Sequence, residues 1–547
     1  MKNLTYLILC LVLTFTYNSF SQKISLKYEN EVNHELYDNY KDLLFKIDDS
    51  IKVLKKNGFI LAEVSELKKI DSLHYRVKIN KNSKFEFIKL EKYQQYFLDE
   101  VNKKLEKYFV GDRKIKLSLL DVLINDLSNL FSTQGYPFAE ISVSYSNIID
   151  SNTISGNLEI DKNQLRKIDG YIFKGYDKFP KKFVENFLGI KIGENLDVKN
   201  LENSSNFVNS LKFVRQTKVP EILFTKDSTI IYFYFEKLKK NNFDGLLTLS
   251  NSESDNKLYL NGYLKFNLLN SLDFGESIKV DYKSVDEGYK LLKTHLKIPY
   301  IFNSNFTIQS ELNLTQRDSL YNSSNFLFKT GLAKKKINNY LGVEFTKSNS
   351  EFSNNNFENF KSYQIFYEVS YHLYNQNENF SNSIFSISAK LSLGEKKQLN
   401  ETFQKNDFNI EIFKKTNISE RSSLFSNLKF EKLNSDNLVN NELLRFGGAE
   451  SIRGFIDESI ATDKYFLLRN NLKFFLNKNF SLLSIFDYAN YSNNVITESN
   501  NIYSLGFGFE FLSKSNHISL NYSKGVDFNQ KFNFQNARLS INFVSFF

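Results

Sequence analysis

The chain has 547 residues, and its 71 basic and 62 acidic residues give a net charge of +9 without a long basic block, which argues against nucleic acid as a partner. No run of 18 consecutive apolar residues occurs, and this excludes membrane-spanning helices. The aromatic content of 16%, from 54 Phe and 31 Tyr, is typical of strands and bilayer interfaces, so a closed β-barrel is the expected way of crossing a membrane.

The first 21 residues have the pattern of a secretory signal peptide. Lys2 supplies the positive start, residues 4–15 are apolar, and Ser19-Phe20-Ser21 fits a cleavage site. The only cysteine, Cys10, lies inside the apolar stretch. We therefore expect residues 1–21 to be removed on export, which leaves a mature chain without disulfides or reactive thiols.

Residues 22–239 contain helical and strand patterns that recur at roughly 75-residue spacing, which indicates an array of modules. The predicted order is strand-helix-helix-strand-strand, and the first copy is the least complete. The predicted modules are 22–82, 83–163 and 164–239. Helices are expected at 40–57, 98–109, 119–134, 180–188 and 198–211, and strands at 59–67, 72–79, 84–90, 138–146, 153–160, 166–174, 213–224 and 229–237.

From residue 240 to residue 547 the period changes to two. Within 258–268, for example, apolar residues at even positions alternate with polar residues at most odd positions, as suits a lipid-facing outside and a wet lumen. We count an even number of such segments, as bacterial barrels require. The sixteen predicted strands begin near residues 243, 257, 276, 289, 304, 323, 338, 360, 383, 407, 421, 463, 479, 502, 516 and 534.

The connections between these strands give an independent test, because turns should be short on the periplasmic side and longer outside. Counting from the first strand, the long polar connections fall on the external side and the tight ones on the periplasmic side. The alternative is a soluble β-sandwich with long loops, which rarely needs so many strands. The long connections are 349–359, 395–406, 435–462 and 492–501, and the tight ones include 336–337, 477–478 and 514–515.

Motifs for catalysis are not found. The five histidines form no metal-ligand pair, and no phosphate-binding loop, nucleophile elbow or paired-cysteine site occurs. Gly506-Phe507-Gly508 lies within a predicted strand and is interpreted as barrel packing. The sequence therefore predicts neither an enzyme nor a bound metal or cofactor.

One segment in the longest external connection differs from an ordinary surface loop. It reads Leu-Arg-Phe-Gly-Gly-Ala-Glu-Ser-Ile-Arg-Gly-Phe over residues 444–455. Its glycines allow a backbone that folds back on itself, and an arginine inside a lumen would need a carboxylate partner. The candidate site residues of this segment are Arg445, Gly447, Gly448, Ile452, Arg453, Gly454 and Phe455.

This segment resembles the signature loop of the BamA-type outer-membrane assembly superfamily, also called the bacterial surface antigen family. The modules resemble POTRA domains, and the chain ends on Phe543, Ser545 and Phe547 as the closing strands of that superfamily do. The tetrapeptide 485–488 matches an inner-wall motif, and the resemblance implies that Arg453 contacts a wall formed by Phe486 and Asp487.

A departure from the superfamily lies in the twelfth strand. Many relatives carry a glutamate there, whereas this chain has Arg469-Asn470-Asn471. We therefore expect no second acidic partner for Arg453 and a looser anchoring of its loop.

The resemblance implies an outer-membrane assembly factor or translocase, closest in layout to the TamA type with three POTRA domains in the periplasm. Substrate strands would add to the barrel seam and to module edges by β-augmentation. Expected partners are unfolded outer-membrane or secreted polypeptides, envelope accessory proteins and outer-membrane lipid.

Two other functions stay open from the sequence. One is a two-partner-secretion pore for a dedicated passenger, although such relatives usually have two POTRA domains and an N-terminal plug helix. Here three modules are counted, and only the short segment 24–33 precedes them. The other is a passive outer-membrane channel.

Overall fold

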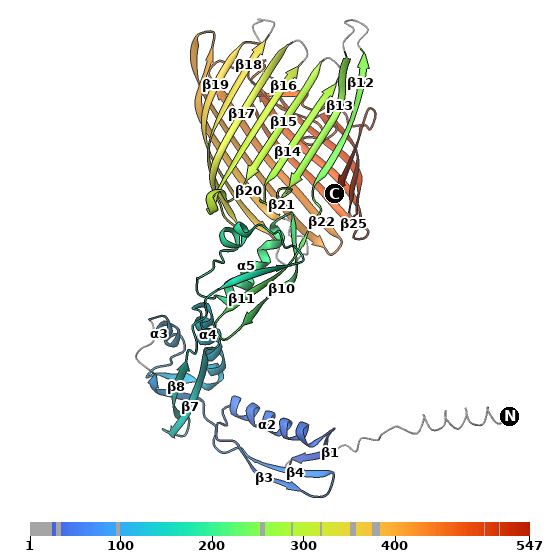
Figure 1. The fold of residues 1–547 in the computed structure, drawn as a ribbon. Helices are drawn as coiled ribbons and strands as arrows, with labels where there is room; N and C mark the ends of the chain where they lie inside the picture. The colour runs from blue at the N-terminus through green and yellow to red at the C-terminus, as the bar shows by residue number, and fades with distance from the viewer. Residues whose placement is uncertain are drawn as a thin grey trace, which may run out of the picture. The chain divides into compact units, whose positions relative to one another are not determined.

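The chain forms two successive regions, mixed α/β modules up to β11 and then a β-barrel (Figure 1). The expected signal peptide lies outside the residues that the structure describes. Contacts divide the chain into two units, one comprising Met1–Lys167 and Asn195–Lys199 and the other comprising Ile168–Glu194 and Asn200–Phe547. This computed structural model describes residues 24–28, 34–93, 99–251, 258–285, 288–317, 320–350, 357–374, 383–496, 498–513 and 515–547.

The first module is a four-stranded sheet with order β2-β1-β4-β3, and it has one helix. The helix buries Leu43 and Ile47 against Leu26 and Val77. The segment 24–33 was expected to precede the modules, but its residues Ile24–Tyr28 form β1, which pairs in parallel with β4 inside this sheet. The module elements are β1 (Ile24–Tyr28), β2 (His34–Tyr37), α2 (Tyr40–Lys56), β3 (Glu63–Lys69) and β4 (His74–Asn80).

The second module has the sheet order β6-β5-β8-β7. Leu123, Leu127 and Phe131 recur at helical spacing on one face of α4 and are fully buried in its core. The three-residue strand β6 is too short to show a period and was not predicted. The elements are β5 (Phe87–Tyr93), α3 (Asp99–Glu106), β6 (Lys114–Lys116), η1 (Leu117–Leu119), α4 (Leu120–Thr133), β7 (Glu140–Ile148) and β8 (Thr153–Asp161).

The third module has the sheet order β10-β11-β9. All three modules share one arrangement, in which the first strand pairs in parallel with the last strand and the last two strands pair antiparallel. The elements are β9 (Gly170–Lys174), the π-helical turn η2 (Phe183–Leu188), α5 (Val198–Asn206), η3 (Phe207–Ser210), β10 (Val214–Phe224) and β11 (Thr229–Lys237). No helix among the described residues is long and apolar enough to cross a membrane.

Sixteen antiparallel strands close the barrel, which confirms the predicted number. The largest difference in a strand start falls on β21, predicted near residue 407 and observed from Glu401. The strands are β12 (Asn242–Asn251), β13 (Leu258–Leu269), β14 (Ser277–Val285), β15 (Tyr289–Ile298), β16 (Phe306–Arg317), β17 (Tyr321–Ala333), β18 (Ile337–Ser350), β19 (Phe360–Tyr374), β20 (Ser383–Gln398), β21 (Glu401–Ser419), β22 (Ser422–Ser435), β25 (Lys464–Phe475), β26 (Phe480–Asn493), β27 (Glu498–Leu512), β28 (Asn516–Asp527) and β29 (Arg538–Phe546).

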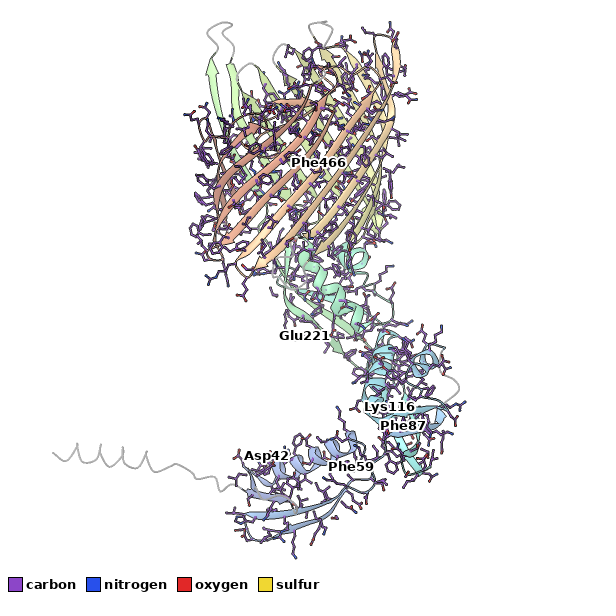
Figure 2. The ribbon with its side chains drawn as sticks, turned by 180° about the vertical axis from the view of Figure 1, so that it is seen from behind. Asp42, Phe59, Phe87, Lys116, Glu221 and Phe466 are labelled. Carbon is purple, nitrogen blue, oxygen red and sulfur yellow. The ribbon has the colours of Figure 1, made fainter. Side chains whose placement is uncertain are left out.

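The two faces of the barrel wall differ as the alternating pattern predicts. Leu341, Ile365 and Ile541 point outward and are 59%, 62% and 67% exposed. Phe466, on β25, also belongs to this outer wall (Figure 2). Inward positions are largely polar, so the barrel has an apolar outer belt and a wet lumen.

Two of the connections expected to be long are short. β20 and β21 are joined by Leu399 and Asn400 alone, with φ angles of 48° and 66°. β26 runs on to Asn493, and β27 begins at Glu498. The strands continue to pair beyond the apolar belt, where both faces are wet and the apolar alternation is lost, so their ends look like loops in the sequence.

The third module is packed against turns at the end of the barrel where β12 begins, which we call the module end. The ring of Phe183 meets Tyr300 edge-on at 4.8 Å, and it occupies the space where a Cβ on Gly275 would lie. The Tyr176 hydroxyl donates to Asp273 at 2.8 Å and accepts from the Asn270 amide at 2.6 Å. Burial and the Asp273 carboxylate raise the pKa of Tyr176.

Lys335 adds a further contact at the module end. Its Nζ donates to the Leu188 carbonyl at 3.2 Å and to the Ser204 hydroxyl at 2.7 Å. Three turns of the barrel, after β13, β15 and β17, therefore hold the third module.

This packing predicts the effect of Gly275→Ala. The new methyl group would collide with the Phe183 ring and force it out of its site, so we expect faster hydrogen exchange and faster proteolysis in residues 168–237. Gly189→Ala is the matched control, because Gly189 has a similar φ angle of +71° and nothing lies within 4 Å of a Cβ at that position.

The double variant Gly275→Ala/Phe183→Ala separates this contact from a general loss of stability. Phe183→Ala alone should cost about 3–5 kcal/mol, and Gly275→Ala should add to it only the about 1–2 kcal/mol of strain that its φ angle of +77° imposes on alanine. Additive effects in the double variant would show that the ring and the glycine are not in contact.

Candidate functional site

The connection between β22 and β25, residues 436–463, folds back into the lumen. It contains a short hairpin formed by β23 (Leu444–Phe446) and β24 (Ile460–Thr462). Its apolar residues pack on inward-facing positions of the wall. Phe446 stacks on Tyr465 with a centroid distance of 4.7 Å, and Ile452 is fully buried beside them.

Glycines give this loop its shape. Gly447 and Gly448 have φ angles of +123° and +92°, and a Cβ on Gly448 would collide with the Asp457 side chain. Gly454, at φ +81°, lies against the backbone of β28, where its Cβ would collide with Gly525 and Lys524. The missing side chain of Gly525 leaves room for the ring of Phe455. These positions require glycine because no L side chain fits the conformation or the space.

Arg453 makes a two-pronged contact with Asp487 on β26. Arg453 Nε donates to Asp487 Oδ2 at 2.8 Å, Nη2 donates to Oδ1, and the Arg453 backbone N–H donates to Oδ2 at 3.1 Å. Arg453 is 4% exposed and Asp487 is 0% exposed. A planar guanidinium matched to a carboxylate in this way fixes orientation as well as charge.

Two residues of β25 complete the arginine site and were not predicted. Arg453 Nη1 donates to the amide oxygen of Asn471, and Arg469 donates to the carbonyls of Glu450 and Ala449 at 2.7 and 3.0 Å. The neutral Asn471 therefore contacts Arg453 from the strand in which many members of the resembled superfamily carry a glutamate. The strand register would have pointed to these two residues. Arg469 lies directly opposite Asp487, and Asn471 is two residues farther along β25, on the same face as Arg469.

The sequence assignment of Phe486 to the lumen wall is wrong. Successive side chains of a strand point to opposite faces, so Phe486 faces outward beside the inward Asp487 and is 44% exposed. Arg445 lies on β23 opposite Ala461, apart from the Asp487 contact.

Acidic residues of the loop reach the opposite wall of the lumen. Glu450 pairs with Lys265 on β13 at 2.9 Å, and Asp457 pairs with Lys283 on β14 at 2.7 Å. Glu458 contacts three side chains of β15 and β16. They are Arg317 at 2.6 Å, Lys293 at 3.4 Å and the Tyr289 hydroxyl at 2.9 Å. Sequence reasoning missed these carboxylates because their partners lie more than a hundred residues away.

The start of the loop is held by a buried ion cluster. Glu442 contacts Lys396 on β20 at 2.6 Å and Lys405 on β21 at 3.2 Å. Asn441 donates to the Ser348 hydroxyl and to the Glu358 carbonyl, both at 2.8 Å. Within the described parts of the chain, no group of three or more His, Cys, Asp or Glu side chains could hold a metal ion.

The barrel seam is the weakest pairing in the wall. β12 and β29 share two register pairs, Asn242 with Phe546 and Phe243 with Ser545, whereas β12 shares ten with β13 and β29 shares eight with β28. Phe543 lies on β29 before these two seam residues. Phe547 follows the strand, and its backbone N–H donates to the Asn241 carbonyl at 2.9 Å. Among the described residues, most backbone groups on the facing edges of β12 and β29 therefore have no partner across the seam.

Comparisons with known proteins identify one family and several similar structures. The model of the family "Haemolysin secretion/activation protein ShlB/FhaC/HecB" matches residues 237–511. CdiB from Acinetobacter baumannii is 11% identical, with 92% of this chain and 96% of CdiB covered and a TM-score of 0.51. CdiB from Escherichia coli is 10% identical, with 92% and 97% covered and a TM-score of 0.50.

BamA from Haemophilus ducreyi, lacking POTRA domains 1–3, is 14% identical, with 84% of this chain and 99% of that chain covered and a TM-score of 0.46. A comparison with curated protein sequences finds no significant match. At these identities the likeness to the two CdiB structures shows a shared fold.

We expect Arg453→Ala to release the loop while the barrel stays inserted. The substitution leaves Asp487 buried without its partner, at a cost of about 3–5 kcal/mol in the stability of the folded loop. Hydrogen exchange of residues 447–459 should accelerate, and conductance in planar bilayers should rise. Arg445→Ala is the matched control from the same loop, and an equal effect there would contradict the specific role of Arg453.

Asn471→Glu tests the departure in β25. A second carboxylate beside Arg453 should strengthen its anchoring and slow hydrogen exchange of the loop. Asn542→Glu places the same charge on an inward position of β29, in register with Ser519 on β28 and on a strand that does not contact Arg453, so it controls for a general effect of charge. Faster exchange in the Asn471→Glu variant would show that the neutral partner is the better one here.

Proposed function

The chain belongs to the ShlB/FhaC/HecB family of haemolysin secretion/activation proteins, and on that premise we propose that it exports a polypeptide passenger through the lumen of its barrel. It is an outer-membrane protein of a polypeptide-translocating superfamily. Export is the function that the sequence analysis kept as an alternative to assembly. The family match favours export, and it covers the barrel strands β12 to β26, nearly all of β27, and the loop.

The observation that carries the proposal is the loop inside a polar lumen. An extended polypeptide needs hydrogen-bonding partners for its backbone, and a wet lumen supplies them inside a bilayer that cannot. The loop occupies this route, and hydrogen bonds and ion pairs hold it to both walls. Such contacts can be exchanged for contacts with a passenger, whereas a filled apolar core could not open in this way.

The modules supply edges where a passenger can first bind. The outer strands of the three sheets, including β3, β7 and β10, have one unpaired edge each within the described parts of the chain. We propose that these modules lie in the periplasm and receive the passenger by β-augmentation. Envelope accessory proteins would use the same edges.

A second function, assembly of other outer-membrane barrels, is favoured by the seam. Two register pairs leave most of the β12 edge open to an incoming strand. Neither function needs a catalytic step or a cofactor, and we propose that the protein has none.

Photocrosslinking in cells separates the two functions. We expect a photoreactive residue at Asn313, on the inward face of β16, to capture one passenger polypeptide during export. The same residue at Phe243, in the seam, should then capture only β29 of the same molecule. Mass spectrometry identifies the captured partners.

Leu341 is the control position, because it faces outward and should give no polypeptide adduct. Several unrelated barrels captured at Phe243, with nothing captured at Asn313, would reject export and favour assembly. Absence of polypeptide adducts at both positions would favour a passive channel.

A further inference from the structure

Four basic side chains line one wall of the lumen on consecutive strands. Lys265, Lys283, Lys293 and Arg317 lie on β13, β14, β15 and β16, which run side by side in the wall (Figure 1). Each of them contacts an acidic residue of the loop. We call these four residues the basic track.

The charge of the basic track is neutralised mainly by the loop. Among the described residues, the side chains that form ion pairs with Lys283, Lys293 and Arg317 are Asp457 and Glu458 alone. Lys265 also has Asp281 of the wall at 3.7 Å. Withdrawal of the loop would therefore remove the ion-pair carboxylates of Lys283, Lys293 and Arg317. The wall itself supplies Asp281, which lies directly opposite both Lys265 and Lys293 in register.

A second group of cations continues the track toward the module end. Lys279 on β14 and Lys297 on β15 share the inward face of Lys283 and Lys293, four residues away along the same strands, which is about 13 Å at 3.3 Å per residue. Among the described residues, no carboxylate lies within ion-pair distance of Lys279 or Lys297. The same holds for Lys212 of the third module. Desolvation and the charges of Lys279 and Lys240 lower the pKa of Lys212.

We infer that the basic track binds an acidic segment of the passenger, and that the acidic residues of the loop occupy this site while the pore is at rest. The inference rests on the proposed export function and specifies the chemistry of its substrate. A passenger segment rich in Asp or Glu would meet Lys212, Lys279 and Lys297 first and then replace Asp457 and Glu458 on the track. Carboxylate is exchanged for carboxylate, so the wall keeps its charge balance at each stage.

The exchange is favoured by the exposure of two of the three loop carboxylates, whereas Glu458 is 28% exposed against an Arg317 side chain that is 18% exposed and is held more firmly. The side chains of Glu450 and Asp457 are 86% and 57% exposed in their ion pairs, and pairs of this kind contribute little stability. They can therefore be displaced by a competing acidic chain of similar charge density. The buried contact between Arg453 and Asp487 lies on the other wall and does not contribute to this competition.

Binding of fluorescein-labelled decaglutamate to the purified full-length protein in nanodiscs tests the inference. A variant with Glu450→Gln, Asp457→Asn and Glu458→Gln frees the track and should bind at least about tenfold more tightly than wild type. A variant with Lys283→Gln, Lys293→Gln and Arg317→Gln should bind at least about tenfold more weakly. Lys473→Gln, a lumen lysine paired with Glu510 on another wall, is the matched control and should stay within about twofold.

Opposite changes in the two triple variants are the expected result, because a merely structural role would weaken binding in both. Binding of labelled decalysine with equal affinity, or unchanged affinity in the loop variant, would overturn the inference. Heat-modifiable migration in gels shows that each variant is folded. In wild-type protein alone, decaglutamate binding should disappear in 1 M salt, where the Debye length is about 3 Å, and its persistence would also overturn the inference.

The binding assay is independent of export. Tight decaglutamate binding without any passenger captured at Asn313 in cells would reject export through the lumen and retain an acidic ligand for the track. Capture of a passenger together with failure of both triple variants to change decaglutamate binding would retain export and reject the acidic segment.

Discussion

An arginine that is almost fully buried inside a barrel must find partners for its charge and its N–H groups, and this requirement determines where the loop lies. Arg453 meets it with the Asp487 carboxylate and the Asn471 amide oxygen. Either charged partner left alone in the same place would be strongly destabilising. Gly454 permits the backbone beside the arginine to approach β28 closely, so the arginine and this glycine together hold the loop against β26 and β28.

The loop is consequently held by two classes of contact that differ in strength. At its start, Glu442 and Lys396 are fully buried, and Arg453 and Asp487 are nearly so. At the basic track the partners are partly hydrated, as Asp457 and Lys283 show with side chains that are 57% and 33% exposed. Hydrated ion pairs exchange at little cost, whereas buried ones do not. The contacts of Glu450 and Asp457 with β13 and β14 are therefore the ones that the loop can exchange at the lowest cost.

Much of the barrel was predictable because the bilayer imposes an alternating pattern that is visible in the sequence. The pattern failed where that constraint ends, at the hydrated tips of β20 and β21. The contact between Arg453 and Asp487 was expected only from a resemblance. Its completion by Asn471 depends on the pairing register of β25 and β26, which no local pattern encodes. The loop carboxylates form no recognisable spacing, since their partners are brought together by closure of the barrel.

The lumen and the seam offer a polypeptide two different environments, and this difference bears on the choice between export and assembly. A strand added at the seam would have one face toward lipid, so it must carry the alternating apolar pattern of a barrel strand. A chain inside the lumen meets water, hydrogen-bonding side chains and the basic track, and it needs no such pattern. The loop carboxylates Asp457 and Glu458 meet cations on β14, β15 and β16, two or more strands away from β12 in the strand order. Glu450 alone of the three meets a cation on β13, the neighbour of β12. The charged contacts of this chain are thus arranged along the route through the lumen, and they favour a hydrated acidic passenger over an apolar barrel strand.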